Sequence, residues 1–294
     1  MRLPHLGLAL LVVAVWGSNF VVIVHGLRDF QPFLFATLRF FFSALPFAFF
    51  FPRPRVAWKW LALYGVLLGA GQFGLLFYAM RSDISPGLTS LVVQTQVFFT
   101  IALYVLLFRE RVGGPALAGI VLAAAGLGVI AFHLDASVTA KGIFTVTCAA
   151  FFWGCANVVV KKAATESKTR INMLAFVVWS SLFAIPPLTL MSLAFEGADS
   201  WSSLARAGFL AWLAVAWQSI GNTLFAFAAW SWLLTRYGAA AVTPYALLVP
   251  VFGMGSSALL LGEPLPPWKL TAAAMVLAGI ALGTVVPALM SRGR

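Results

Sequence analysis

Charged side chains are scarce in this sequence. Of its 294 residues, 9% are Asp, Glu, Lys or Arg, whereas 62% are hydrophobic. Soluble domains usually carry about 25% charged residues, so a water-soluble globule built from this chain would have too few charges to cover its surface. The composition therefore excludes a soluble enzyme, a disordered regulator and an ordinary nucleic-acid-binding domain. It leaves an integral membrane protein with many spans.

The side chains that usually form disulfides, metal sites and active sites are also few. The two cysteines, Cys148 and Cys155, lie seven residues apart on one predicted helix and form no disulfide framework. The three histidines lie near span ends and form no cluster that would hold a metal. No phosphate-binding glycine loop and no nucleophile–base pair is present. We therefore expect no catalytic residue, no metal and no cofactor.

Long apolar runs occupy nearly all of the chain. A bilayer core about 30 Å thick needs roughly 20 apolar residues of helix. Lipid offers the backbone no hydrogen-bond partner, and these runs are continuous rather than alternating, so they predict helices. The first run follows Arg2 but is too long for the apolar core of a signal peptide. The breaks at charge, Pro and Gly give ten predicted spans: 4–26, 32–52, 57–80, 85–107, 114–133, 141–161, 172–194, 207–235, 238–261 and 268–288.

The positive residues indicate how the chain is oriented. Cytoplasmic segments of membrane proteins carry an excess of Lys and Arg. With the N-terminus in the cytoplasm, thirteen of the 19 Lys and Arg fall inside, five fall outside, and Arg39 lies within a span. This asymmetry accounts for the net charge of +11 without a nucleic-acid partner. Both termini are predicted to be cytoplasmic.

The second half of the sequence resembles the first. Three pairs of segments match in order, with offsets of 137 to 153 residues. Trp16-Gly17-Ser18-Asn19 matches Trp153-Gly154-Cys155-Ala156-Asn157, and Pro46 matches Pro186. The third match joins Leu106-Leu107-Phe108-Arg109-Glu110 to Leu259-Leu260-Leu261-Gly262-Glu263. Each half then holds five spans. Because five is odd, the second half enters the membrane the opposite way up, as in many secondary transporters. We expect two repeats, 1–136 and 137–294, with a site near the midplane between them.

These motifs resemble the drug/metabolite transporter superfamily, with two EamA-type domains. The resemblance covers the whole chain and rests on the Trp-Gly starts of the halves, Leu38-Arg39-Phe40, and the ends of spans four and nine at Glu110 and Glu263. It implies an all-α membrane protein of ten helices, arranged as two inverted five-helix repeats around a central cavity. It is most similar to bacterial inner-membrane exporters of amino acids and related metabolites, but cargo varies widely in the superfamily.

The eight acidic residues all fall at span ends or in loops. No carboxylate is predicted mid-membrane to bind and release a proton or a sodium ion. This absence favours gradient-driven export over proton antiport, although backbone carbonyls can also bind ions.

Arg39 is the one cation predicted inside a span. It could attract a substrate carboxylate, or it could be structural, reaching the outer interface or the carbonyls of a helix end. A phosphorylated cargo would call for several basic residues, because Lys and Arg neutralise phosphate. A single Arg argues against such a cargo.

Neutral polar and aromatic side chains are the other candidates within the spans. Amides donate and accept hydrogen bonds, which suits a zwitterion. Aromatic rings would favour apolar or aromatic amino acids. The alternative is that the polar groups join helix to helix. The predicted substrate-binding residues are Trp16, Asn19, Gln72, Tyr78, Gln94, Gln96, Trp153, Asn157, Trp217, Asn222 and Tyr245.

Span nine contains Pro244 and Pro250, each of which frees a helical carbonyl. A broken helix at membrane depth is tolerated where it lines a cavity, so this span is predicted to act as a gate hinge or to be a static kink. Gly279 and Gly283 in span ten predict close helix packing or a dimer face. We expect a monomer or a weak dimer.

The leading hypothesis is an inner-membrane transporter that exports amino acids by alternating access. A broad-specificity drug exporter is the first alternative. A non-transporting scaffold or membrane enzyme is the second. An enzyme would show clustered catalytic side chains, and a scaffold would not need paired polar faces in an inverted repeat. The expected partners are a small molecule and the lipid bilayer, with no nucleic acid.

Overall fold

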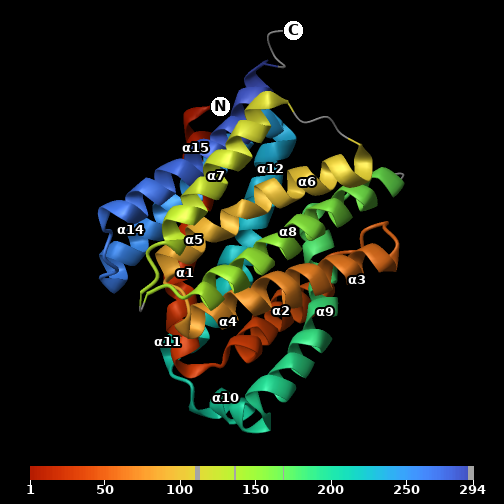
Figure 1. The fold of residues 1–294 in the computed structure, drawn as a ribbon. Coiled ribbons are helices and arrows are strands. Elements are labelled where there is room, and N and C mark those ends of the chain that lie inside the picture. Colours follow the sequence, from red (N-terminus) through yellow and green to blue (C-terminus); the bar gives the residue numbers. More distant parts are fainter. Residues whose placement is uncertain (110–112, 136, 168, 291–294) are drawn as a thin grey trace.

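The computed structural model describes residues 1–109, 113–135, 137–167 and 169–290, and these residues fold into a helical bundle (Figure 1). Nine helical stretches are long and apolar enough to cross a membrane, and a tenth, Pro32–Ala48, is shorter. Across the described residues the only β-type pairing is in isolated bridges near Val138. The prediction of a ten-helix, all-α membrane protein is confirmed.

The first half of the bundle holds five spans, two of which are built from several helical segments. The segments are α1 (Leu3–Asp29), α2 (Pro32–Ala48), α3 (Trp58–Val66), η1 (Leu67–Gly74), α4 (Leu75–Ser82), α5 (Pro86–Val92), η2 (Val93–Thr95), α6 (Gln96–Phe108) and α7 (Gly114–Ala131).

The second half follows the same plan, with a short excursion between its second and third spans. The segments are α8 (Ala140–Glu166), α9 (Met173–Met191), η3 (Ser192–Glu196), η4 (Ala198–Ser202), α10 (Ser203–Arg206), α11 (Phe209–Ala216), η5 (Trp217–Phe225), α12 (Ala226–Tyr237), α13 (Ala239–Val242), η6 (Thr243–Leu248), α14 (Val249–Leu261) and α15 (Pro267–Met290).

Most predicted span ends agree with the structure to within a few residues, but the second span is shorter than predicted. Its helix ends at Ala48 rather than at residue 52. Pro52 and Pro54 follow, and a proline forces the residue before it towards an extended backbone. Two residues of the sequence predictions, Glu110 and the repeat boundary at Ala136, lie outside the described residues.

The two halves exchange partners across the bundle. Helix α1 of the first half packs on α11, α12 and α14 of the second, and α8 of the second half packs on α4, η1 and α6 of the first. Between them α2 packs on α9, and α7 runs beside α15 (Figure 1). The start of α1 and the end of α15 lie at one end of the bundle. We name this the cytoplasmic end, after the positive-residue prediction, and the opposite one the external end.

Irregular helical segments occur at matching places in the two halves. The third span of each half contains a π-helical segment, η1 and η5, and the fourth span of each contains a 3₁₀ segment, η2 and η6. π-Helical segments are rare and are frequent at functional sites. The match places altered backbone at corresponding depths of both halves.

Helices α7 and α15 pack backbone to backbone through glycine. A Cβ atom on Gly119 would lie 2.3 Å from the carbonyl oxygen of Gly279, and one on Gly279 would lie 2.5 Å from that of Gly119. A Cβ on Gly283 would face Phe98 at 3.6 Å. This glycine face is therefore covered within the chain, and its interpretation as a dimer face is wrong.

Candidate functional site

Arg39 lies at the centre of a polar network that joins the two halves. Its Nη1 donates to Gln218 Oε1 at 2.9 Å, and its Nη2 donates to Thr223 Oγ1 at 3.1 Å. The guanidinium carbon lies 3.5 Å from the ring centroid of Phe73. Hydrogen bonds to a charged group contribute about 1.5–3 kcal/mol each, and a desolvated cation–π contact adds about 2 kcal/mol. These contacts offset part of the cost of burying the charge.

The network extends from Arg39 into α1 and fixes the π-helical segment of the eighth span. Gln218 Nε2 donates to Asn19 Oδ1 at 2.8 Å. The hydroxyls of Ser43 and Ser219 both donate to the carbonyl of Arg39, at 2.8 and 3.0 Å. Spans one, two and eight are thereby tied together by uncharged partners around one cation.

This geometry excludes one of the positions that the sequence allows for the Arg39 side chain. The side chain is 1% exposed and bonds to residues in mid-span. The interpretation that it reaches the outer interface or helix-end carbonyls is therefore wrong. Its Nε is buried without a partner among the described residues.

A second polar cluster joins α6 to α8. Asn157 Nδ2 donates to Gln96 Oε1 and to Thr100 Oγ1, both at 3.0 Å. The hydroxyl of Tyr104 donates to the carbonyl of Asn157 at 3.4 Å. Asn157 is the sequence counterpart of Asn19, so each half contributes one Asn of its first span to a contact with the other half.

The ninth span is broken where its prolines predict. The 3₁₀ segment η6 begins beside Pro244, and α14 begins with Pro250 in its first turn. The carbonyl of Ala246, four residues before Pro250, accepts a long hydrogen bond of 3.5 Å from Gln94 Nε2. This contact brings the irregular segments of spans four and nine together.

Aromatic rings flank the polar centre on the side of α12. The ring of Trp16 lies edge-on to Phe227 at 5.7 Å and tilted on Trp230 at 5.1 Å, measured between centroids. Its Nε1 donates to the carbonyl of Asn222 at 3.4 Å. Trp217, one residue before Gln218, has a buried Nε1 without a partner among the described residues.

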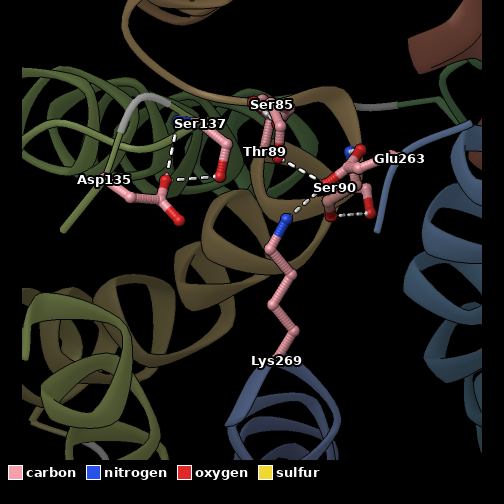
Figure 2. A network of polar contacts seen from close by, with 8 residues as sticks. Ser85, Thr89, Ser90, Asp135, Ser137, Glu263 and Lys269 are labelled. Carbon is pink, nitrogen blue, oxygen red and sulfur yellow. Dashed lines mark hydrogen bonds and ion pairs between the residues drawn. The ribbon is translucent and has the colours of Figure 1, made fainter. Parts of the chain in front are cut away.

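The external end holds a buried ion pair of the second half, whose carboxylate also bonds to the first half (Figure 2). Lys269 Nζ lies 3.0 Å from Glu263 Oε1, with side chains 1% and 7% exposed. The other oxygen of Glu263 accepts from the backbone N–H of Gly87 at 2.9 Å, and Ser85 donates to the same carboxylate. A Cβ on Gly87 would lie 2.9 Å from this carboxylate, so a larger residue there would have to displace Glu263.

Other external carboxylates bind helix starts in the opposite half. Glu196 accepts from the N–H groups of Phe33 and Leu34 at 2.6 and 3.1 Å, and Asp29 accepts from that of Gly208 at 2.8 Å. A carboxylate at a helix N-terminus satisfies free N–H groups and faces the positive end of the helix dipole.

Two hollows open at the cytoplasmic end, one beside α9 and α12 and one between the α2–α3 and α8–α9 connections. None of the predicted substrate-binding residues lines either hollow.

Comparison with known proteins agrees with this architecture. The sequence model of the EamA-like transporter family matches residues 4–132 and again 140–285. The chain belongs to this family.

Two relatives are both named "Probable amino-acid metabolite efflux pump". The one from Salmonella typhimurium is 42% identical over 93% of this chain and 92% of its own length, and the one from Escherichia coli is 40% identical over the same shares. A solved crystal structure matches 99% of each chain with a TM-score of 0.64 at 17% identity, which shows the fold alone. This EamA family member is therefore a multi-pass membrane transporter rather than an enzyme.

The structure does not bring all of the predicted residues of this transporter together. Tyr78 is exposed at the external end, where it stacks on Phe33 at 5.8 Å, away from the central network. Gln72 is buried in η1 with its Oε1 unpartnered among the described residues. Trp153 packs at the edge of two apolar clusters, and Tyr245 packs at the edge of another.

The predicted substrate-binding set leaves out two central partners of Arg39, Gln218 and Thr223. Gln218 shares a helix face with Asn222, and that spacing was the available signal for it. Thr223 gave no such signal, because an isolated Thr in an apolar run is usually a packing residue that bonds its own helix.

Proposed function

We propose that this protein exports amino acids and related metabolites across the bacterial inner membrane by alternating access between its halves. The observation that carries the proposal is the Arg39 network: one buried guanidinium with only neutral partners, held between spans one, two and eight. The printed names of the two relatives at 40% and 42% identity support this class of cargo.

The chemistry of the network suits a zwitterion. Arg39 supplies the positive charge for a carboxylate, while the amides of Asn19 and Gln218 donate and accept without fixing a charge. The rings of Trp16 and Trp230 supply an apolar surface for the rest of the substrate. Of the predicted substrate-binding residues, Asn19 thus joins the polar network of Arg39, and Trp16 belongs to the aromatic group with Trp230.

Alternating access is supported by the unequal ends. The external end is held by carboxylates that bind helix starts in the opposite half, whereas hollows open at the cytoplasmic end. The inferred state is closed to the outside. Span nine, broken at Pro244 and Pro250, is the proposed hinge, because α14 carries Glu263 just beyond its end.

Transport is proposed to proceed without a dedicated proton-binding carboxylate. The described acids all lie at helix ends or in connections, and Glu263, the most buried acid of the described ion pairs, sits at the external end against Lys269. The concentration gradient of the substrate then drives export. The further proposals are cytoplasmic termini, two repeats that meet near residue 136, and a monomer or weak dimer.

Counterflow in proteoliposomes tests the function. We expect exchange of labelled Phe, Thr and Met, little exchange of phenylalaninamide, which lacks the carboxylate, and no acceleration by an imposed pH gradient. Faster exchange of a drug panel would favour the drug exporter instead. Strong acceleration by the pH gradient would overturn the uncoupled mechanism.

Substitution of Arg39 tests the site. Arg39→Leu should lower amino-acid exchange by about tenfold to a hundredfold, since it removes the charged donor proposed for the substrate carboxylate, a contact of about 1.5–3 kcal/mol. Arg39→Lys should retain part of the rate. Arg206→Leu, an exposed external arginine, is the matched control and should leave exchange unchanged. Equal rates for Arg39→Leu and the control would remove the basis for the assignment.

A further inference from the structure

The cytoplasmic end carries a small hollow lined by three arginines. It has a volume of about 310 Å³. Arg53 and Arg55 reach it from the α2–α3 connection, and Arg170 reaches it from the α8–α9 connection. The two connections come from different halves of the chain. The hollow therefore gathers cations from segments more than a hundred residues apart in sequence.

None of the described residues that line this hollow carries a carboxylate. Among the described residues of the cytoplasmic end the one acid is Glu166, which accepts from Trp60 Nε1 at 2.7 Å and lies 3.4 Å from Lys59 Nζ. The carboxylate of Glu166 is thus bonded to side chains of α3. Within the part of the chain that the structure describes, no acid is paired with the three guanidinium groups.

The arginines retain donors for a ligand. The guanidinium carbon of Arg53 lies 4.4 Å from the ring centroid of Trp58, a contact that positions the head without using its N–H groups. Arg170 Nη2 makes a long bond of 3.4 Å to Thr235. Guanidinium groups bind phosphate oxygens through paired N–H donors, so phosphate is the group that this hollow fits best.

A larger groove of about 650 Å³ continues from the arginine hollow. The two share Arg170, Ile171 and Asn172. The groove runs between the start of α9 and the end of α12, and its walls are mainly apolar, with Met173, Leu174, Ala228, Trp232 and Leu234. A phosphate group in the hollow would thus sit at the head of a mainly apolar groove.

The surroundings are those of the membrane–water interface. Phe49 and Phe50, just before Arg53, are 85% and 78% exposed, and Trp58 is half exposed. Exposed aromatic rings beside cations are typical of the headgroup region, and basic pockets between spanning helices bind anionic lipid headgroups. Inorganic phosphate has no apolar part that could occupy the groove, whereas a phospholipid has acyl chains. The groove therefore favours a lipid as the source of the phosphate.

We propose that the hollow of Arg53, Arg55 and Arg170 binds the phosphate of an anionic phospholipid, whose acyl chain lies in the groove between α9 and α12. The site is separate from the Arg39 network and does not depend on what the protein transports.

Lipid binding to the full-length protein in detergent tests this site, by native mass spectrometry and by thermal protection. The probes are phosphatidylglycerol, phosphatidylcholine with the same acyl chains, and inorganic phosphate. We expect phosphatidylglycerol to bind at least tenfold more tightly than phosphatidylcholine, and inorganic phosphate to give little protection. Each cation near a membrane surface strengthens binding of anionic lipid by about fivefold. The triple variant Arg53→Gln/Arg55→Gln/Arg170→Gln should therefore lose about a hundredfold.

The matched control is Arg2→Gln/Arg109→Gln/Lys162→Gln, which removes the same charge from the same end without touching the hollow. It should stay within about twofold of the unmodified protein. If the triple variant does not fold, Arg170→Gln alone should lose about fivefold. Equal binding of both lipids, equal losses in the two triple variants, or protection by inorganic phosphate as strong as by phosphatidylglycerol would each overturn the proposal.

Discussion

The two ends of this transporter use their charges in different ways. At the external end, carboxylates meet the starts of helices that belong to the opposite half: Glu196 at α2, Glu263 at α5 and Asp29 at α11. At the cytoplasmic end, Glu166 bonds to side chains of α3 and is half exposed, while three arginines line a hollow whose described lining residues include no acid.

This difference separates two tasks of charge in a membrane protein. Cations that face the cytoplasm set the topology and can remain unmatched, because anionic lipid lies nearby. Carboxylates that bind helix starts of the opposite half tie that half in place. Each such contact contributes about 0.3–2 kcal/mol. Together the contacts stabilise the closed external end, but each one can be broken separately at a small cost. A gate that must open needs contacts of this kind.

The largest effect is expected at the buried ion pair. Glu263→Gln leaves the ammonium of Lys269 buried without its partner, and breaking such a pair costs about 3–5 kcal/mol. The unfolding temperature in detergent should fall sharply. The double variant Glu263→Gln/Lys269→Met should recover most of the loss, whereas Asp199→Asn, an exposed acid of the same end, should change little. A loss for Glu263→Gln no larger than that for Asp199→Asn would contradict the comparison.

A second test concerns the packing that brings span nine against spans one and four. A Cβ on Gly253 would lie 2.4 Å from the hydroxyl of Ser90, whereas one on Gly255, in the same helix, would meet nothing within 4 Å. Gly253→Ala should therefore cost about 1–3 kcal/mol by overpacking. Gly255→Ala should be neutral or slightly stabilising, since Ala is the better helix former. Equal unfolding temperatures for the two variants would show that this contact is not tight.

The two ends can be compared directly by replacing one glutamate at each end with glutamine. Glu196→Gln weakens a contact with two N–H groups at the start of α2, and the loss of such a cap costs about 0.5–2 kcal/mol. Glu166→Gln weakens an exposed pair that solvent screens, so its cost should be small. The drop in unfolding free energy should be greater for Glu196→Gln. The reverse order would mean that the cytoplasmic end is the more firmly held.

Much of the fold could be predicted from the sequence, because apolar length and charge decide where a chain crosses a membrane. The central contacts could not. Arg39 and Gln218 are 179 residues apart, and no local spacing indicates that the guanidinium lies against that amide. The sequence predicts Tyr78 in the site because it is a polar side chain within an apolar run, but such a run does not show at which depth or on which helix face a residue lies. The π-helical segments left no signal in the hydrophobic pattern.

The smallest expected effect concerns an exposed acid at the external end. The hydroxyl and the backbone N–H of Ser137 both donate to Asp135 Oδ1 at 2.6 Å (Figure 2). Both bonds lower the pKa of Asp135, and the bond from the hydroxyl has the larger effect. A carboxyl whose pKa is lower in the folded state contributes stability above its unfolded pKa of about 3.9 and loses it as the pH falls through the folded value. The fall in unfolding temperature between neutral and strongly acidic pH should thus be slightly smaller for Asp135→Asn than for the unmodified protein. Ser137→Ala, which keeps the N–H bond, should lie between them, and a larger fall for Asp135→Asn would reverse the sign and refute the assignment.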